Sequence, residues 1–128
     1  MRIVNRTSYP TPEVEAIVRF AMTGRGRPRY LEAFQREQRT VLVLPQRCGG
    51  DRAGFTPFDT SLPIDLYLQP PSCYPQGPDA QDPYQDLFLS AAHEMYHDQH
   101  ETQPCAQGQC EVSAEGFAKR VWRERTPR

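Results

Sequence analysis

Apolar positions along the chain recur with two different periods, which predict strands in some segments and helices in others. Short apolar runs at residues 40–44 and 64–68 adjoin prolines and are typical of strands, and a further short strand is expected over residues 2–6. Thr11, Pro12 and Glu13 form a helix-start signal, and the apolar residues at positions 14, 17, 18 and 21 continue it as one helical face. A short helix is also expected over residues 29–36.

Two longer helices are predicted in the last third of the chain. Asp82 is a candidate N-cap, with Pro83 at the first helical position, and Gln85 follows three residues after the cap. One apolar stripe of that helix is formed by Tyr84, Phe88, Ala91, Ala92 and Met95. A second amphipathic helix is expected over residues 110–123, with a stripe of Ala114, Phe117, Ala118, Val121 and Trp122. This order of elements predicts an α+β fold in which helices cover one face of a small antiparallel or mixed sheet.

Composition fits one domain over residues 1–128. The chain of 128 residues is long enough to bury about two-thirds of its unfolded surface, and its net charge of −1 demands neither an acidic nor a basic partner. The 13 prolines predict a loop-rich middle. Since neither a secretory signal nor a membrane-spanning run is visible, a cytoplasmic protein without a membrane partner is expected.

The strongest chemical signal is His93-Glu94-Met95-Tyr96-His97, a His-Glu-x-x-His motif on the first of these two helices. Residues four apart lie on one helical face, so both imidazoles can bind one metal ion. All three histidines of the chain fall within residues 93–100. Glu94 is then the expected general base, which takes a proton from water that zinc has activated.

A catalytic zinc ion usually has three protein ligands, and the candidates for the third are His100, Glu101, Glu111 and Glu115. His100 lies seven residues from His93, about 10.5 Å along the axis, which is too far for one ion to reach both unless the helix breaks. It therefore ranks second. Glu111 is preferred because it shares the inward stripe of the second helix, where a lone carboxylate is costly unless it is paired or bound to metal. Alternatively, Glu111 only complements the helix dipole in the first turn.

The helix with His93 and His97 and the helix with Glu111 together resemble the gluzincin arrangement. Residues 93–97, followed by Glu111, Ala114, Phe117 and Ala118, are similar to minigluzincins and to small bacterial and phage metallopeptidases of the ImmA/IrrE type. The resemblance covers about the last third of the chain. It implies a zincin-like fold, His93, His97 and Glu111 as zinc ligands, and Glu94 as base. The metzincin family is excluded because Gln103 stands where its third histidine would be.

The expected function is therefore a zinc-dependent peptidase acting on a peptide or protein substrate. The alternative is a non-catalytic zincin-like module that binds metal and a protein or DNA partner. Residues 64–68 are a candidate exposed edge strand for pairing with an extended peptide, or else ordinary sheet. Oxyanion donors are sought among Tyr74, Tyr84 and Tyr96, and acceptors for the imidazole N–H groups among Asp82, Asp98 and Glu115.

Two further features point elsewhere. Arg25-Gly26-Arg27-Pro28 matches the core of an AT-hook, although a solvated turn is the favoured interpretation and a nucleic-acid partner is not expected. The four cysteines, at positions 48, 73, 105 and 110, are expected to be free thiols. A disulfide around Cys105 and Cys110 ranks next, and a structural metal last.

Overall fold

The computed structural model describes residues 1–23, 39–50, 52, 54–57, 59, 61–74, 82–100 and 109–125. The elements follow in the order β1 (Arg2–Asn5), α1 (Thr11–Thr23), β2 (Thr40–Pro45), β3 (Gly54–Phe55), β4 (Ile64–Leu68), a 3₁₀ turn η1 (Pro71–Cys73), α3 (Pro83–His100) and α4 (Gln109–Glu124). The helix expected over 29–36 and the AT-hook-like segment 25–28 lie outside the described residues. The α+β class is confirmed.

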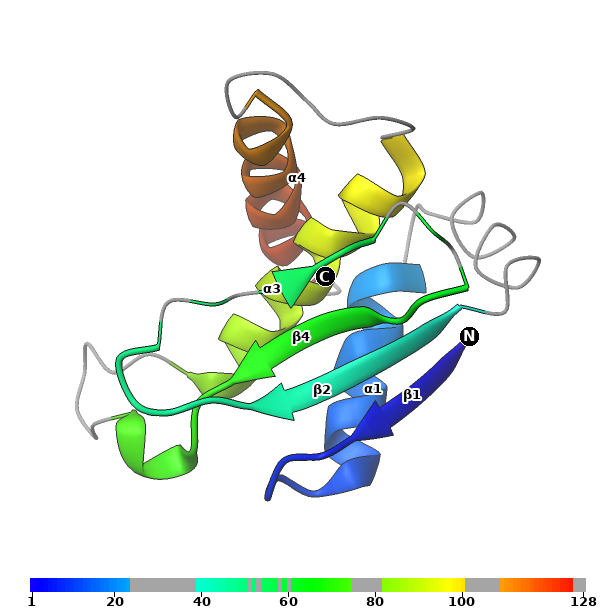
Figure 1. Ribbon diagram of the computed structural model, residues 1–128. Helices are drawn as coiled ribbons and strands as arrows, with labels where there is room; N and C mark the ends of the chain where they lie inside the picture. Colours follow the sequence, from blue (N-terminus) through cyan, green and yellow to red (C-terminus); the bar gives the residue numbers. More distant parts are fainter. Residues whose placement is uncertain are drawn as a thin grey trace.

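The strands form one mixed sheet in the order β1-β2-β4-β3 (Figure 1). β1 and β4 both run parallel to β2, with Ile3 opposite Val41 and Val41 opposite Ile64. Only β3 is antiparallel, pairing Gly54 with Leu66. Because β3 runs against β4, it carries the chain back across the sheet and allows β4 to lie parallel to β2.

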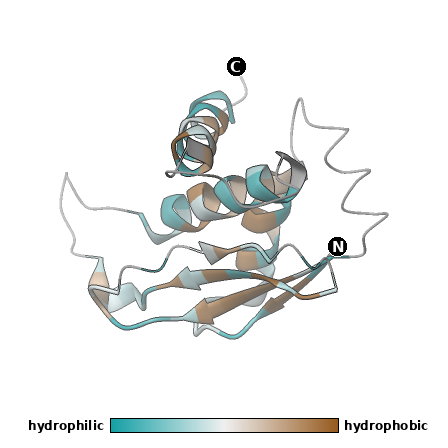
Figure 2. Ribbon diagram, turned by 45° about the horizontal axis from the view of Figure 1, so that its top comes forward, coloured by the Kyte–Doolittle hydropathy of each residue, from teal (hydrophilic) through white to brown (hydrophobic). Residues whose placement is uncertain are grey.

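The helices lie on one face of this sheet, and hydrophobic residues occur in the strands and in the helices that cover them (Figure 2). α1 packs against β1 and α3, α3 also packs on β3 and β4, and α4 packs on α3. The buried core draws on all three helices and on β1, β2 and β4; its fully buried members include Val14, Val18, Met22, Val41, Val43, Ile64, Leu66, Leu87 and Met95. The predicted stripe of α3 is therefore its core-facing side, with Leu87 added.

Of the two interpretations of residues 64–68, the exposed edge strand is wrong and ordinary sheet is observed. β4 lies between β2 and β3, with Ile64, Leu66 and Leu68 buried and Asp65 and Tyr67 half-buried. The edges are β1 and β3, and β3 has only two residues, too few to show an alternating pattern. Its Phe55 is 59% exposed.

The start of α3 agrees with its sequence signal. Asp82 Oδ1 accepts a hydrogen bond of 2.9 Å from the backbone N–H of Tyr84, which is the contact an N-cap makes. α3 then continues as one helix to His100. This continuity matters for the site, because it fixes the separation of His93, His97 and His100 along one axis.

The expectation of free thiols is also wrong. Cys48, in the turn after β2, forms a disulfide with Cys73 at the end of η1, 25 residues away in sequence. Cys110 is disulfide-bonded as well, and Cys105 lies outside the described residues. Among the helices of the described ranges, none is long and apolar enough to cross a membrane.

Candidate metal centre

The imidazoles of His93 and His97 meet on the side of α3 that faces α4. Their Nε2 atoms are 3.0 Å apart, and both side chains are largely buried. One helical turn separates the two residues, so the backbone itself sets this convergence. Two imidazole nitrogens at this spacing can share one cation.

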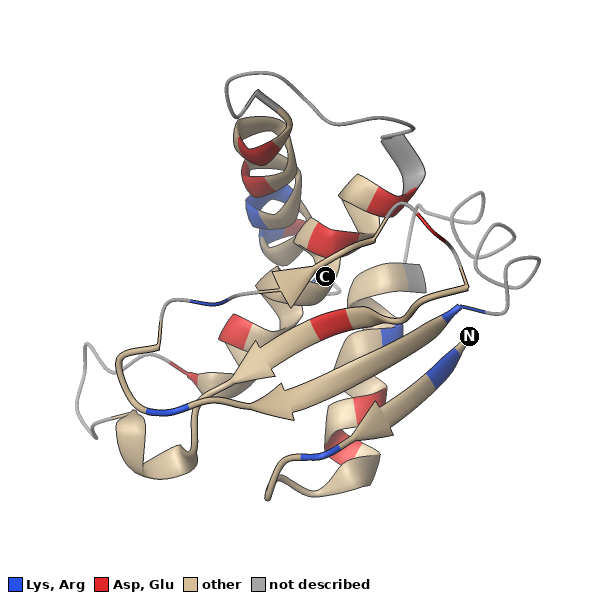
Figure 3. Ribbon diagram, viewed as in Figure 1, with Lys and Arg blue, Asp and Glu red and all other residues tan. Residues whose placement is uncertain are grey.

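Glu111, in the first turn of α4, completes a triangle of donor atoms. Its Oε2 lies 3.0 Å from Nε2 of His93, and its Oε1 lies 2.8 Å from Nε2 of His97. In a tetrahedral zinc site with bonds of about 2.0–2.1 Å, donor atoms are about 3.3 Å apart. The three side chains therefore stand close to the spacing that one such ion requires. Figure 3 shows acidic residues gathered at the beginning of α4, where this helix faces α3.

The expected placement of Glu111 needs one correction. Its side chain is 66% exposed, so it does not belong to the buried stripe that Ala114, Ala118 and Val121 form further along α4. The first turn extends beyond the core, as the dipole interpretation assumed. The carboxylate nevertheless reaches back to both histidines.

Glu94 lies beside the histidines and is 4% exposed. Donor atoms of His93, Glu94 and His97 all lie within 4.8 Å of one another, so these three residues alone could hold a metal ion, although not specifically zinc. Glu94 Oε2 is 3.9 Å from Nε2 of His93, however, and Oε1 is engaged by Thr56. The oxygens of Glu111 approach both Nε2 atoms more closely, so Glu111 is the better-placed candidate for a third ligand.

Burial raises the pKa of Glu94 above its usual value. The hydrogen bond from Thr56 and the neighbouring imidazoles of His93 and His97 oppose this increase, and Glu111 adds to it. A carboxylate whose pKa is raised is a stronger base than an exposed one. The environment of Glu94 thus suits proton transfer better than permanent ion pairing.

Glu115 approaches the other nitrogen of His93. Its Oε2 lies 3.4 Å from Nδ1, one turn along α4 from Glu111. A carboxylate at Nδ1 favours the tautomer with its proton there, which leaves the Nε2 lone pair free for a cation. Of the three expected acceptors, Glu115 lies in the right place.

The other two expected acceptors have different contacts. Asp82 caps α3 at its opposite end and is not a neighbour of the histidines. Asp98 forms a buried ion pair with Arg39, with 3.0 Å between its Oδ1 and Nη1.

The remaining candidates divide by position. Glu101 lies outside the described residues, and α3 does not break before His100, so the condition that would bring His100 to the same ion as His93 is not met. Tyr84 donates to Glu13, and Tyr74 is hydrogen-bonded to Asp86, both near the start of α3. Tyr96 is the one candidate oxyanion donor beside the site, with its ring 6.5 Å from that of His97.

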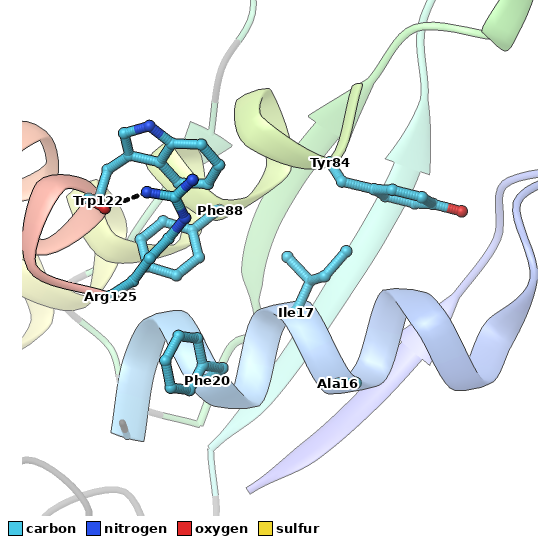
Figure 4. Close-up of a pocket in the computed structure, with 7 residues that line it drawn as sticks. All are labelled: Ala16, Ile17, Phe20, Tyr84, Phe88, Trp122 and Arg125. Carbon is cyan, nitrogen blue, oxygen red and sulfur yellow. Dashed lines mark hydrogen bonds between the residues drawn. The ribbon is translucent and has the colours of Figure 1, made fainter. Parts of the chain in front are cut away.

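A second concave feature is separate from this site. An aromatic pocket of about 420 Å³ opens between α1, α3 and α4 (Figure 4). The guanidinium of Arg125 stacks over the Trp122 ring at its rim. Its lining contains no candidate metal ligand and consists of Ala16, Ile17, Phe20, Tyr84, Phe88, Trp122 and Arg125.

Three residues that contact this part of α3 were not anticipated from the sequence: Gly54 and Thr56 beside Glu94, and Arg39 beside Asp98. They come from β3, the segment after it and the position before β2, so no local pattern connects them with residues 93–98. Comparison of the chain with protein-family models, with curated proteins and with solved structures found no match. Function is therefore inferred from the site itself.

Proposed function

We propose that this protein is a zinc-dependent peptidase with a zincin-like arrangement of its two C-terminal helices. The observation that carries the proposal is the triangle formed by Nε2 of His93, Nε2 of His97 and the Glu111 carboxylate, with edges of 2.8–3.0 Å. Two imidazoles and one carboxylate form the ligand set of a catalytic zinc site that keeps a fourth position open.

The donor chemistry fits zinc. Glu115 beside Nδ1 of His93 favours the tautomer that a metal ligand needs, and Glu111 supplies a negative charge. When bound, zinc would supply a Lewis acid that lowers the pKa of a water ligand to about 7 and polarises a carbonyl group. Tyr96, beside His97, is the candidate donor to the developing oxyanion.

Glu94 has the position of a general base. Its Oε2 faces the histidine pair, whereas its Oε1 accepts a hydrogen bond from Thr56. We infer that Oε2 takes a proton from the attacking water and then passes it to the leaving amine as the peptide bond breaks. Burial excludes bulk water from the carboxylate and keeps its basicity high.

Metal analysis together with a Glu94→Gln variant tests this function. Purified wild type should contain about one zinc ion per chain and cleave a randomised mixture of quenched-fluorescent peptides. Glu94→Gln preserves the shape of the side chain but removes the base, so kcat should fall by about 10²- to 10⁴-fold while zinc content is retained. A wild type that binds zinc without hydrolysing any peptide would favour the binding-module alternative, and loss of metal from Glu94→Gln would show that Glu94 is a ligand.

A further inference from the structure

Thr56, in the segment after β3, forms a hydrogen bond with the side chain of Glu94. Thr56 Oγ1 lies 2.7 Å from Glu94 Oε1 and 3.2 Å from the backbone oxygen of the same residue. Since a hydroxyl has one proton, the shorter contact to the carboxylate is the main hydrogen bond. Thr56 is 38 residues from Glu94 in sequence, so only the fold brings them together.

This contact distinguishes the two oxygens of the carboxylate. Oε1 is held by Thr56, and Oε2 is left on the side of His93, with 3.9 Å between it and Nε2. Rotation of the carboxylate would break the hydrogen bond. Since the two oxygens are chemically equivalent, what Thr56 fixes is the orientation of the carboxylate, with one oxygen held by the hydroxyl and the other on the side of His93.

A glycine on the edge strand leaves room for this orientation. A Cβ at Gly54 would lie 2.8 Å from Cγ of Glu94, 3.0 Å from its Oε2 and 2.9 Å from the backbone oxygen of Asp65. Real side chains do not pack that closely, so β3 can approach α3 here only because residue 54 has no side chain. The close approach of Gly54 and the hydrogen bond from Thr56 thus restrict the movement of the Glu94 carboxylate from two directions.

Arg39 links the segment that contains Thr56 and Pro57 to the next turn of α3. Its Nη2 donates to the backbone oxygen of Pro57 at 2.8 Å, and its Nη1 pairs with Asp98 at 3.0 Å. Glu94 and Asp98 are four residues apart and share one face of the helix. Residues 56 and 57 are consequently attached to consecutive turns of α3, directly through Thr56 and through the buried guanidinium of Arg39.

We propose that Thr56 is a positioning residue for the peptidase reaction, which fixes Glu94 so that Oε2 points at the metal centre. The inference rests on the proposed function, because it assigns Thr56 a role in orienting the general base. Thr56 itself does not touch the reacting atoms. Its contribution should therefore appear in the rate of the chemical step and not in substrate or metal binding.

Three variants compared with the wild type test this role. Thr56→Val keeps the shape of the side chain and removes the hydroxyl, Thr56→Ser keeps the hydroxyl, and Thr7→Val is the matched control. Thr7 also donates a hydrogen bond, of 2.6 Å to Asn5, but in the loop between β1 and α1. For each protein, zinc content is measured, and kcat and KM are determined on one quenched-fluorescent peptide that the wild type cleaves.

Thr56→Val should lower kcat by about 10- to 100-fold, the range typical of residues that orient a metal site. KM and zinc content should stay within about twofold of wild type, since neither substrate nor metal contacts the hydroxyl. Thr56→Ser should restore kcat to within about threefold, which a purely packing role for the γ-methyl group would not produce. Thr7→Val should leave both constants unchanged.

The inference is overturned if Thr56→Val retains the kcat of the wild type, or if Thr56→Ser is as impaired as Thr56→Val. It is also overturned if Thr56→Val loses zinc, since the hydroxyl would then support the ligands and not the base. Failure of the proposed function itself would be recognised differently, because the wild type would bind zinc yet cleave no peptide, and the positioning role would fall with it.

Discussion

The two sides of the histidine pair are built in opposite ways. On the strand side, Glu94 is 4% exposed and lies against Gly54 and Thr56, and the neighbouring residue Pro57 is bonded to the buried guanidinium of Arg39. On the α4 side, Glu111 is 66% exposed and reaches the histidines from the first turn of its helix. Two glutamates that approach the same imidazoles thus have different surroundings.

Under the proposed function, this difference assigns the two glutamates different roles. A general base must be held in one orientation and protected from water, whereas a metal ligand can be exposed because the ion itself orders it. Changes on the strand side should therefore affect stability and rate, and changes on the α4 side should affect metal affinity. Four substitutions test this division.

The largest effect is expected from Arg39→Met. The substitution keeps most of the volume of the side chain but leaves Asp98 charged and buried, and breaking one partner of a buried ion pair costs about 3–5 kcal/mol. Urea unfolding of the metal-free protein measures the loss. The control is Lys119→Met, which removes an exposed ion pair with Glu115 and should cost less than about 1 kcal/mol. Equal losses for the two variants would contradict a special role for the strand side.

Glu111→Ala should act on metal and not on folding. Removal of a ligand is expected to weaken zinc affinity by more than the roughly 100-fold typical of residues that only support a ligand. The free energy of unfolding of the metal-free protein should change little, because the side chain is mostly exposed. Competition with a zinc chelator measures the affinity. Glu124→Ala, at the other end of α4, is the matched control, and a similar affinity for both variants would remove Glu111 from the ligand set.

Gly54→Ala should lower kcat without affecting metal binding. The added methyl group would press on Cγ and Oε2 of Glu94, so kcat should fall by about 10- to 100-fold while zinc is retained. Gly116→Ala, in the middle of α4, provides the control, since a Cβ there meets nothing within 4 Å. That variant should keep its rate and gain up to about 1 kcal/mol of stability from helix propensity. Full activity of Gly54→Ala would mean that the carboxylate has room to move.

The smallest effect is expected from Asp65→Asn on β4. Burial raises the pKa of Asp65, so its charged form opposes folding. The free-energy cost of this buried charge is absent below the pKa that Asp65 has in the unfolded chain. It grows as pH rises from that pKa to the folded pKa, and above the folded pKa it is present in full. Asp65→Asn should therefore be more stable than wild type at pH 7 and equal to it near pH 3.

Asp59→Asn provides a comparison of opposite sign. Hydrogen bonds from Ser61 lower the pKa of Asp59, so its charge favours folding above the pKa of the unfolded chain. Asparagine should lose that advantage at neutral pH, whereas the advantage of the wild type should fade on acidification. Urea midpoints across the pH range measure both variants, and equal signs would contradict the pKa directions.

The sequence predicts the local parts of this architecture and not the long-range ones. His93 and His97 converge because one helical turn separates them, and Asp82 marks the start of their helix through a cap that involves only neighbouring residues. Both features follow from helix geometry alone. The helix that carries Glu111 is expected for the same reason, whereas the apolar runs predict the strands but leave the sheet either antiparallel or mixed.

Features that depend on tertiary proximity could not be predicted. Thr56 and Arg39 meet α3 across 38 and 59 residues of chain, and neither has a periodic signature. The two residues of β3 are too few to suggest a strand, so the sequence leaves open whether β4 is an edge of the sheet. The exposure of Glu111 was misjudged because helical periodicity gives the direction of a side chain but not where the core ends.

The bond between Cys48 and Cys73 has a consequence for the stability of the folded chain. It joins the turn after β2 to the turn after β4, and the chain between the two cysteines carries Gly54 and Thr56. Closing a loop of this length stabilises a fold by about 3 kcal/mol, and glutathione in a reducing cell interior would open it. We therefore expect the folded protein to be less stable when this bond is reduced.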